Sequence, residues 1–234
     1  MEKDGVLIIA HRGLSGLILE NTCEAFELAG QRSYYGIETD VHVTKDGKYI
    51  IAHDDDLQRI AGLDRVIEES DYEDLRALRF KDPYRKDCAT SFFLPSLEEY
   101  CKICKKYDKQ AILELKNRMA PKDVEGIAAA VTECGWFERT TFISFSEENL
   151  VDLKKVYPTA NVQFLVEECT EEELSFMIEN NFDADIQWDR VTKNAVERLH
   201  GAGLKVNCWT VDDEEDAKRV KACGVDYITS NILE

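Results

Sequence analysis

The run Val6-Leu7-Ile8-Ile9-Ala10 ends abruptly at His11-Arg12-Gly13, where apolar side chains give way to a histidine and an arginine. The same change recurs in Gly36-Ile37-Glu38-Thr39-Asp40-Val41 and, after the four residues Thr44-Lys45-Asp46-Gly47, in Tyr49-Ile50-Ile51-Ala52-His53-Asp54. Short apolar runs bounded by turn residues are typical of buried strands. We therefore expect a sheet whose strands end in polar side chains.

Strand-like runs and helical segments alternate along the whole chain. The expected strands are residues 7–11, 37–41, 111–115, 140–145, 162–166, 184–187, 205–209 and 226–229. The expected helices are residues 22–31, 96–107, 121–134, 147–157, 171–180, 193–202 and 214–223. Asn21, with Glu24 three residues later, is typical of the N-cap of the first of these helices.

This alternation predicts an α/β protein with a parallel sheet. We predict a closed (β/α)8 TIM barrel rather than a doubly wound open sheet. Polar residues end strands from both halves of the chain, and a barrel brings these ends around one mouth, where an open sheet would spread them out.

The run at residues 49–53 does not fit the alternation, because only four residues separate it from the preceding strand. Parallel strands need a crossover of about a dozen residues or more, whereas a short turn containing Asp-Gly indicates an antiparallel hairpin. We expect this hairpin arm to pair Val43 with Lys48 and Glu38 with His53, which would deliver His53 to the side of Glu38.

Residues 55–94 have weak periodicity and many charges, and we interpret them as a small insertion over or beside the barrel mouth. A short helix is expected at residues 71–78. Because no glycine- or serine-rich linker interrupts the sequence, residues 1–234 are expected to form a single domain.

The composition narrows the classes of partner. The net charge is −18, from 29 basic and 47 acidic residues, which disfavours nucleic acid and anionic membrane surfaces. No apolar run approaches the length of about 20 residues that a membrane span needs, so we expect no stable membrane anchor. The eight cysteines, without a secretion signal, are expected to be reduced thiols of a cytoplasmic protein. The oligomeric state is left open.

Three carboxylates are expected to face one another. Glu38 and Asp40 share a face of their strand because side chains alternate with period two, and Glu114 ends a second strand beside Lys116. Carboxylate oxygens suit a hard cation such as Mg²⁺ or Ca²⁺. The alternative is that these are solvated charges at strand ends. We favour the metal site because polar residues at the C-terminal face of a barrel are usually functional.

His11 and His53 are expected to converge on these carboxylates. Since imidazole titrates near neutral pH, one histidine can accept a proton while the other donates one. Arg12 offers a bidentate fork for a phosphate, and Lys116 adds a positive charge. Trp209 ends a strand and is interpreted either as a wall of the substrate pocket or as a core residue.

At this point the sequence resembles the glycerophosphodiester phosphodiesterases. The resemblance is carried by His11-Arg12-Gly13, Glu20-Asn21-Thr22, Glu38-x-Asp40, Thr44-Lys45-Asp46-Gly47, His53-Asp54, Glu114-x-Lys116 and Trp209-Thr210-Val211. It implies a TIM barrel and the metal-dependent hydrolysis of glycerophosphodiesters to glycerol 3-phosphate and an alcohol. One departure is Leu19, which stands where the family usually has proline.

The resemblance also assigns roles by position. His11 and His53 match the acid–base pair of the family, and Arg12 matches its phosphate-binding arginine. The matching metal ligands are Glu38, Asp40 and Glu114, while Lys116 and Trp209 match residues that contact the substrate.

Two further functions compete with this interpretation. The first is lysophospholipase D-type cleavage of lysophospholipids, which needs an apolar channel for an acyl chain. The side chains available for such a channel are Leu14, Leu17, Ile18, Leu19, Phe92 and Phe93. The second is a non-catalytic protein that binds phosphate esters on the same barrel, which is expected to lack some of the polar positions found here.

Overall fold

The structure is a computed structural model that describes residues 5–85, 87 and 89–234, so that the first four residues, Lys86 and Cys88 lie outside it. Eight parallel strands follow one another in the order β8-β7-β6-β5-β4-β2-β1-β9. Their bounds are β1 Leu7–Ala10, β2 Gly36–Val43, β4 Gln110–Leu115, β5 Thr140–Ser144, β6 Asn161–Val166, β7 Asp183–Gln187, β8 Val206–Trp209 and β9 Tyr227–Ser230.

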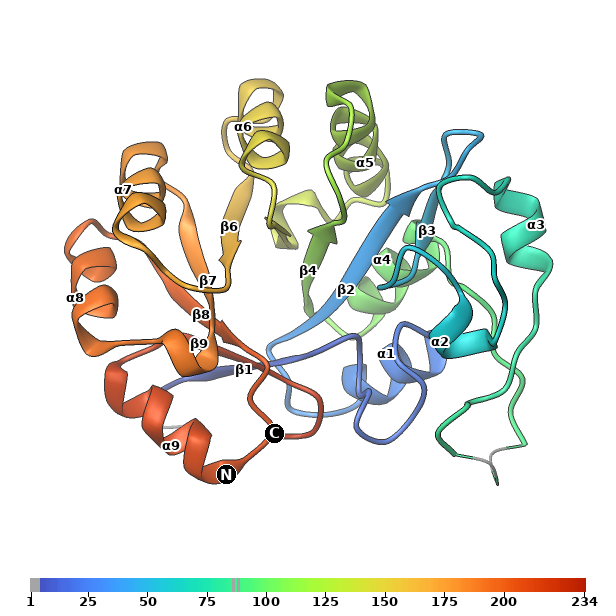
Figure 1. The fold of residues 1–234 in the computed structure, drawn as a ribbon, viewed down its shortest axis with the longest axis horizontal. Helices are drawn as coiled ribbons and strands as arrows, with labels where there is room; N and C mark the ends of the chain where they lie inside the picture. Colours follow the sequence, from blue (N-terminus) through green and yellow to red (C-terminus); the bar gives the residue numbers. More distant parts are fainter. Residues whose placement is uncertain (1–4, 86, 88) are drawn as a thin grey trace.

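The two end strands of this series lie side by side. Asp226 N donates to Val206 O at 2.8 Å, and Val211 N donates to Thr229 O at 3.0 Å, which joins β8 to β9 outside the regular ladders. The sheet is therefore a nearly closed barrel with helices between its strands (Figure 1). The predicted fold class is confirmed, and the open-sheet alternative is wrong.

Apart from the short helices of the insertion, the helices that the described residues form between the barrel strands surround the barrel (Figure 1). Their bounds are α1 Cys23–Gly30, α4 Leu97–Lys106, α5 Pro121–Glu133, α6 Glu147–Val156, α7 Glu171–Asn180, α8 Lys193–Gly201 and α9 Glu214–Cys223, with short 3₁₀ turns η1 Phe137–Arg139 and η2 Trp188–Arg190. Within the described part of the chain, no helix has the length and apolar character needed to cross a membrane.

The predicted N-cap of α1 is wrong by one residue. Thr22 is the N-cap, and its hydroxyl accepts a hydrogen bond from Ala25 N at 3.2 Å. Asn21 instead adopts a left-handed conformation with φ of 52°, and its side chain donates to Asp40 and accepts from Thr39. The amide is thus occupied in supporting β2, which leaves the capping to the next residue.

Alternation along the strands separates two apolar layers. Ile9, Ile112, Ile143 and Leu165 fill the barrel interior as one buried cluster. The outward side chains of the strands pack against the helices in the main core. Because the interior layer lies below the strand ends, it forms a dry floor beneath the polar residues of the mouth.

The hairpin arm is confirmed, but its predicted register is wrong by one residue. Strand β3 (Tyr49–Ile51) pairs antiparallel with β2, and Val43 is opposite Tyr49 rather than Lys48. The reason lies in the turn, where Thr44 N donates to Lys48 O at 2.8 Å and the Thr44 hydroxyl accepts from Lys48 N at 3.0 Å. The loop therefore contains five residues. His53 follows the end of β3 and reaches the barrel mouth from a loop.

The insertion at residues 55–94 lies beside β3 on the outside of the barrel (Figure 1). It contains α2 (Gln58–Ala61) and α3 (Tyr72–Ala77), which agrees with the helix expected at residues 71–78. Its apolar side chains form a separate small cluster with Ile50 and Leu19. That the whole chain forms a single domain stays a prediction.

Candidate active site

The site begins at the turn that ends β1. Arg12 has φ of 53° and Gly13 has φ of 76°, so the chain reverses sharply after His11. A Cβ atom on Gly13 would lie 2.7 Å from the backbone carbon of Ala25, which explains the glycine. The turn aims the backbone N–H of Arg12 at Glu38 Oε2, at 2.8 Å. The first strand is thereby tied to the carboxylates of the second.

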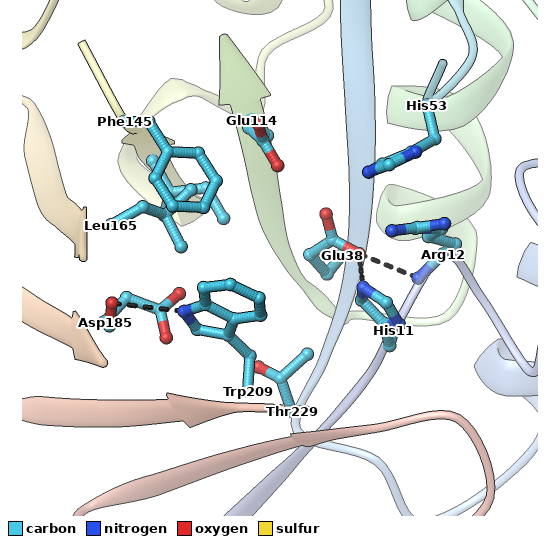
Figure 2. A pocket seen from close by; sticks show the side chains of 11 residues that line it. His11, Arg12, Glu38, His53, Glu114, Phe145, Leu165, Asp185, Trp209 and Thr229 are labelled. Carbon is cyan, nitrogen blue, oxygen red and sulfur yellow. Dashed lines mark hydrogen bonds and ion pairs between the residues drawn. The ribbon is translucent and has the colours of Figure 1, made fainter. Parts of the chain in front are cut away.

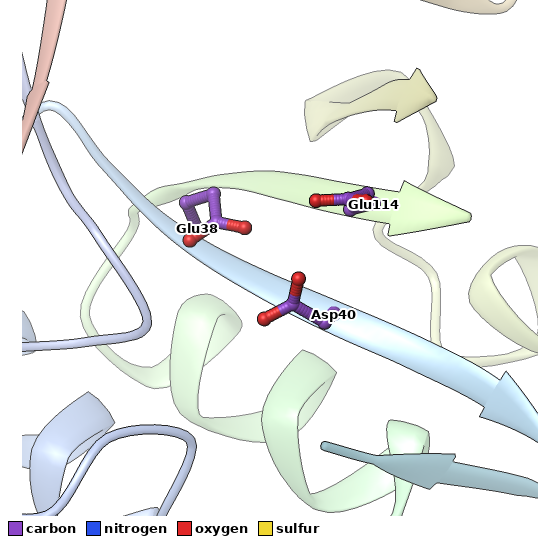
Figure 3. Close-up of side chains that lie close together, drawn as sticks. All are labelled: Glu38, Asp40 and Glu114. Carbon is purple, nitrogen blue, oxygen red and sulfur yellow. The ribbon is translucent and has the colours of Figure 1, made fainter. Parts of the chain in front are cut away.

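Three carboxylates gather where β2 and β4 approach their C-terminal ends (Figure 3). Glu38 and Asp40 project from β2 and Glu114 projects from β4, and each offers an oxygen within 4.8 Å of the other two. Their residues are only 3 %, 1 % and 7 % exposed, so they are not solvated charges at strand ends. This arrangement has the donor atoms of a site for a hard divalent cation.

The crowding of these carboxylates shifts their pKa values. Burial raises the pKa of Glu38 well above its ordinary value, and the charge of Asp40 raises it further. Burial also raises the pKa of Glu114 to about 7. Burial alone would raise the pKa of Asp40, but the charges of Arg12 and Lys116 hold it below its usual range. Without a cation, the repulsion among the three carboxylates therefore favours the protonated forms of Glu38 and Glu114.

The two cationic side chains of the site flank Asp40 without binding it closely. Arg12 Nε lies 3.7 Å from Asp40 Oδ2, and Lys116 Nζ lies 3.7 Å from Asp40 Oδ1 and 2.9 Å from Glu114 Oε1. Arg12 Nε and Asp40 Oδ1 are both buried, and neither has a hydrogen-bond partner among the described residues. Buried polar atoms without partners are rare in native structures, and these two are placed to meet a ligand.

Both histidines are oriented through Nδ1. His11 Nδ1 lies 2.8 Å from the amide oxygen of Asn231, which can only accept, and His53 Nδ1 lies 2.7 Å from Asp54 Oδ1. In each ring Nε2 is therefore left for the site, and Nε2 of His11 lies 4.0 Å from Glu38 Oε2. Burial and a neighbouring positive charge lower the pKa of His11 to about 4, which keeps this ring neutral at pH 7.

The carboxylate beside His53 belongs to a larger ionic network. Arg59 pairs with Asp54 at 2.7 Å and with Glu20 at 2.7 Å, and Glu20 also pairs with Arg12 at 2.9 Å. Burial lowers the pKa of His53, while Asp40 and the hydrogen bond to Asp54 oppose that shift. The network fixes the distance between the two loops that carry Arg12 and His53.

A pocket opens between the polar residues and an apolar wall (Figure 2). The apolar wall consists of Ile143, Phe145, Leu165 and Trp209, and the ring of Phe145 meets the indole edge-to-face with centroids 5.5 Å apart. Trp209 Nε1 donates to the backbone oxygen of Asp185 at 3.2 Å, which holds the indole across the pocket. Trp209 therefore lies in the pocket wall rather than in the core.

The structure brings the predicted site residues together. The pocket is lined by His11, Arg12, Glu38, His53, Glu114 and Trp209, while Asp40 and Lys116 contact its carboxylates. Sequence reasoning missed Asn231, Phe145 and Asp185. Alternation from Ile143 was a signal for Phe145, whereas no local pattern signals Asn231, which follows β9 and reaches His11 across 220 positions of the chain.

Comparison with known proteins identifies the family to which this chain is similar. Residues 11–233 match the model of the glycerophosphoryl diester phosphodiesterase family. A glycerophosphodiester phosphodiesterase of Caldanaerobacter subterraneus is 28% identical over 228 residues, covering 96% of this chain and 93% of the relative. Another, of Bacillus altitudinis, is 29% identical, covering 94% and 92%. A human lysophospholipase D is 42% identical, but over only 66 residues, 28% of this chain and 21% of the relative.

Solved structures of glycerophosphodiester phosphodiesterases have the same fold as this chain. A phosphodiesterase of Oleispira antarctica, in complex with the product sn-glycerol-3-phosphate, has a TM-score of 0.84 at 26% identity, covering 96% of this chain and 92% of that one. A putative glycerophosphoryl diester phosphodiesterase of Silicibacter pomeroyi has a TM-score of 0.87 at 25% identity, covering 97% and 90%. The chain belongs to the glycerophosphoryl diester phosphodiesterase family.

Proposed function

We propose that the protein hydrolyses glycerophosphodiesters to glycerol 3-phosphate and an alcohol, with the help of a divalent cation and two histidines. The observation that carries this proposal is a pocket in which Glu38 and Glu114, with Asp40 beside them, share the lining with two oriented histidines and an arginine. Family membership supports the reaction class, as does the solved relative whose product is sn-glycerol-3-phosphate.

The residues fit a divalent cation. Asp40 Oδ1 is buried without a hydrogen-bond partner, and Glu38 and Glu114 offer further oxygens within 4.8 Å. We propose that these three side chains hold Mg²⁺ or Ca²⁺, since both prefer oxygen ligands. When bound, the cation supplies positive charge that stabilises the phosphoryl oxygens as negative charge develops.

The remaining polar side chains divide the work of an in-line displacement at phosphorus. Arg12 Nε, which has no hydrogen-bond partner among the described residues, and Lys116 Nζ bind the non-bridging oxygens of the phosphate. We assign the general base to His11, because its Nδ1–H donates to the Asn231 amide oxygen and Nε2 is left to accept a proton from the nucleophile. We assign the general acid to His53, because the carboxylate of Asp54 stabilises its protonated ring.

The two competing functions have less support. Of the side chains that an acyl channel would need, Leu14, Leu19 and Phe92 are buried in the cores, and only Leu17 is an exposed large apolar residue. A non-catalytic binding protein would not need two histidines aimed at a carboxylate cluster. We still predict that the protein binds no nucleic acid and that it is cytoplasmic. Its oligomeric state is an open question.

The reaction is tested by incubating the protein with a panel of soluble glycerophosphodiesters and micellar lysophospholipid, with Mg²⁺, with Ca²⁺ or with a chelator. We expect release of glycerol phosphate from the soluble diesters in metal and none in chelator, as measured by a coupled dehydrogenase assay. Turnover of the micellar substrate alone would favour the lysophospholipase alternative. Binding without turnover in either metal would favour the non-catalytic one.

Replacing either proposed catalytic histidine should remove most of the activity. We expect His11→Ala and His53→Ala to lower kcat by roughly 10²- to 10⁴-fold, because each deletes one proton-transfer group. His200→Ala is the matched control, because His200 lies on α8 and bonds Asp226 at 2.8 Å. This control should retain wild-type rates, and a near-normal rate in His11→Ala would contradict the scheme.

The assignment of His11 as base and His53 as acid can be tested with a leaving group that departs without being protonated. With the p-nitrophenyl ester of glycerol phosphate, His53→Ala should recover most of its loss relative to an alkyl ester. His11→Ala should lose as much on the aryl ester as on the alkyl ester. The opposite pattern would exchange the two roles.

Glu38→Gln tests the crowding of the carboxylates. The pKa of Glu38 is raised above its ordinary value of 4.5 in the folded protein, so the folded state binds this proton more tightly than the unfolded state does. The metal-free wild type should therefore lose stability as the pH rises above about 4.5, since stability falls wherever the folded state binds more protons. Glu38→Gln should flatten this loss when urea unfolding is measured in chelator at pH 5 and pH 8.

The same variant should respond weakly to metal. At a metal concentration a hundredfold above Kd, the wild type should gain about 2.7 kcal/mol of stability, and Glu38→Gln should gain almost none. Equal gains in both proteins would show that the cation binds elsewhere.

A further inference from the structure

Asp185 lies in the pocket opposite the histidines, and the sequence motifs give it no role. It projects from β7 toward the cavity, near Leu165 and beside the indole of Trp209 (Figure 2). Its residue is only 1 % exposed. A fully buried carboxyl group on the apolar side of a pocket is costly unless it has a partner.

One oxygen of this carboxyl group has no partner in the part of the chain that the structure describes. Asp185 Oδ1 is buried and has no hydrogen-bond partner. The indole N–H of Trp209 is committed to the backbone oxygen of Asp185 rather than to its carboxyl group. The neighbouring amide of Asn207 donates to the Thr229 hydroxyl at 2.9 Å and also hydrogen-bonds the Asp185 carboxyl group, but Oδ1 is not satisfied by this contact. An oxygen aimed into the pocket is therefore left for a ligand.

The surroundings of Asp185 favour a neutral ligand group over a cation. Burial raises the pKa of Asp185 well above its ordinary value, Asn207 opposes this shift, and the charge of Glu114 adds to it. The lining nearest to it, Leu165 and Trp209, offers no ionic partner. A hydroxyl group matches this carboxyl in either protonation state, because it both donates and accepts. An ammonium group would require a buried ion pair, which costs desolvation of both charges.

We propose that Asp185 is a specificity-determining residue that hydrogen-bonds a hydroxyl group on the carbon skeleton of the phosphodiester. This inference rests on the proposed function, and it adds the chemical class that the apolar side of the pocket selects. The hydroxyl has two sources, the glycerol moiety common to all these substrates or a polyol that departs as the alcohol.

Two variants distinguish the hydroxyl from other partners. Asp185→Asn keeps an acceptor oxygen without a charge, whereas Asp185→Leu removes the hydrogen bond and keeps a side chain that branches at the same carbon. We expect Asp185→Leu to lower kcat/KM by about 10- to 100-fold and Asp185→Asn to lose less than fivefold. Thermal unfolding is the folding control. Asp185→Leu should still unfold in one cooperative transition, somewhat below the wild-type temperature, because the Asn207 amide loses this hydrogen bond.

The substrates separate the two sources of the hydroxyl. Glycerophosphoglycerol has hydroxyls on both sides of the phosphate, whereas glycerophosphoethanolamine and glycerophosphocholine have them on the glycerol side alone. Equal losses of Asp185→Leu on all three place the contact on the retained glycerol. A loss confined to glycerophosphoglycerol places it on the departing alcohol. A loss of Asp185→Asn confined to glycerophosphoethanolamine would overturn the proposal in favour of an ammonium partner.

A binding measurement tests the glycerol arm without turnover. Calorimetry in the presence of metal would compare sn-glycerol 3-phosphate with propyl phosphate, which lacks both hydroxyls. If the contact is on the glycerol, the wild type should prefer glycerol phosphate by tenfold or more, and Asp185→Leu should lose this preference.

Unchanged kinetics on all substrates in folded Asp185→Leu would mean that only water occupies the site, which would overturn the inference while leaving the proposed function intact. An inactive wild type would instead refute the proposed function.

Discussion

The mutual repulsion of Glu38, Asp40 and Glu114 is the constraint around which the mouth of the barrel is built. Three carboxylates within 4.8 Å of one another and almost without exposure are unstable unless positive charge or protons compensate them. Arg12 and Lys116 compensate in part, at 3.7 Å from Asp40. The compensation is therefore partial, and the cluster has the oxygen donors that could hold a divalent cation.

The barrel holds these carboxylates together even though the chain carries a net charge of −18. The ladder between β2 and β4 fixes the carboxylates on rigid strands, with Asp40 directly beside Glu114. The glycine turn after β1 ties the backbone of Arg12 to Glu38. The strands therefore hold the carboxylates, while the segments that follow strands β1 and β3 hold the two histidines.

Much of this could be predicted from the sequence, because strand periodicity is a local property. Alternation alone placed Glu38 with Asp40, and the short Asp-Gly turn predicted an antiparallel arm. The register of that arm could not be predicted, because it depends on hydrogen bonds between Thr44 and Lys48. A one-residue slip moves every side chain of the arm to the other face, and the spacing of the Asp-Gly turn does not say which residues pair.

Long-range partners were the second limit of prediction. Asn21 resembled a helix cap by spacing, yet its amide serves Asp40 and Thr39 on β2. Asn231 orients His11 from the other end of the chain. Asp185 could be recognised as a pocket residue only in the folded barrel, where it lines the same pocket as the two histidines. Each of these depends on which strands become neighbours, and local sequence does not encode that.

The central claim is that the three carboxylates hold a divalent cation, and it is tested most directly by a crystal structure grown with Mn²⁺ or Ca²⁺. Anomalous scattering would locate the ion independently of any assay. The account predicts one strong peak at about 2.0–2.6 Å from oxygens of Glu38, Asp40 and Glu114. Ordered carboxylates with no peak between them at saturating metal, or a peak only elsewhere in the molecule, would contradict it.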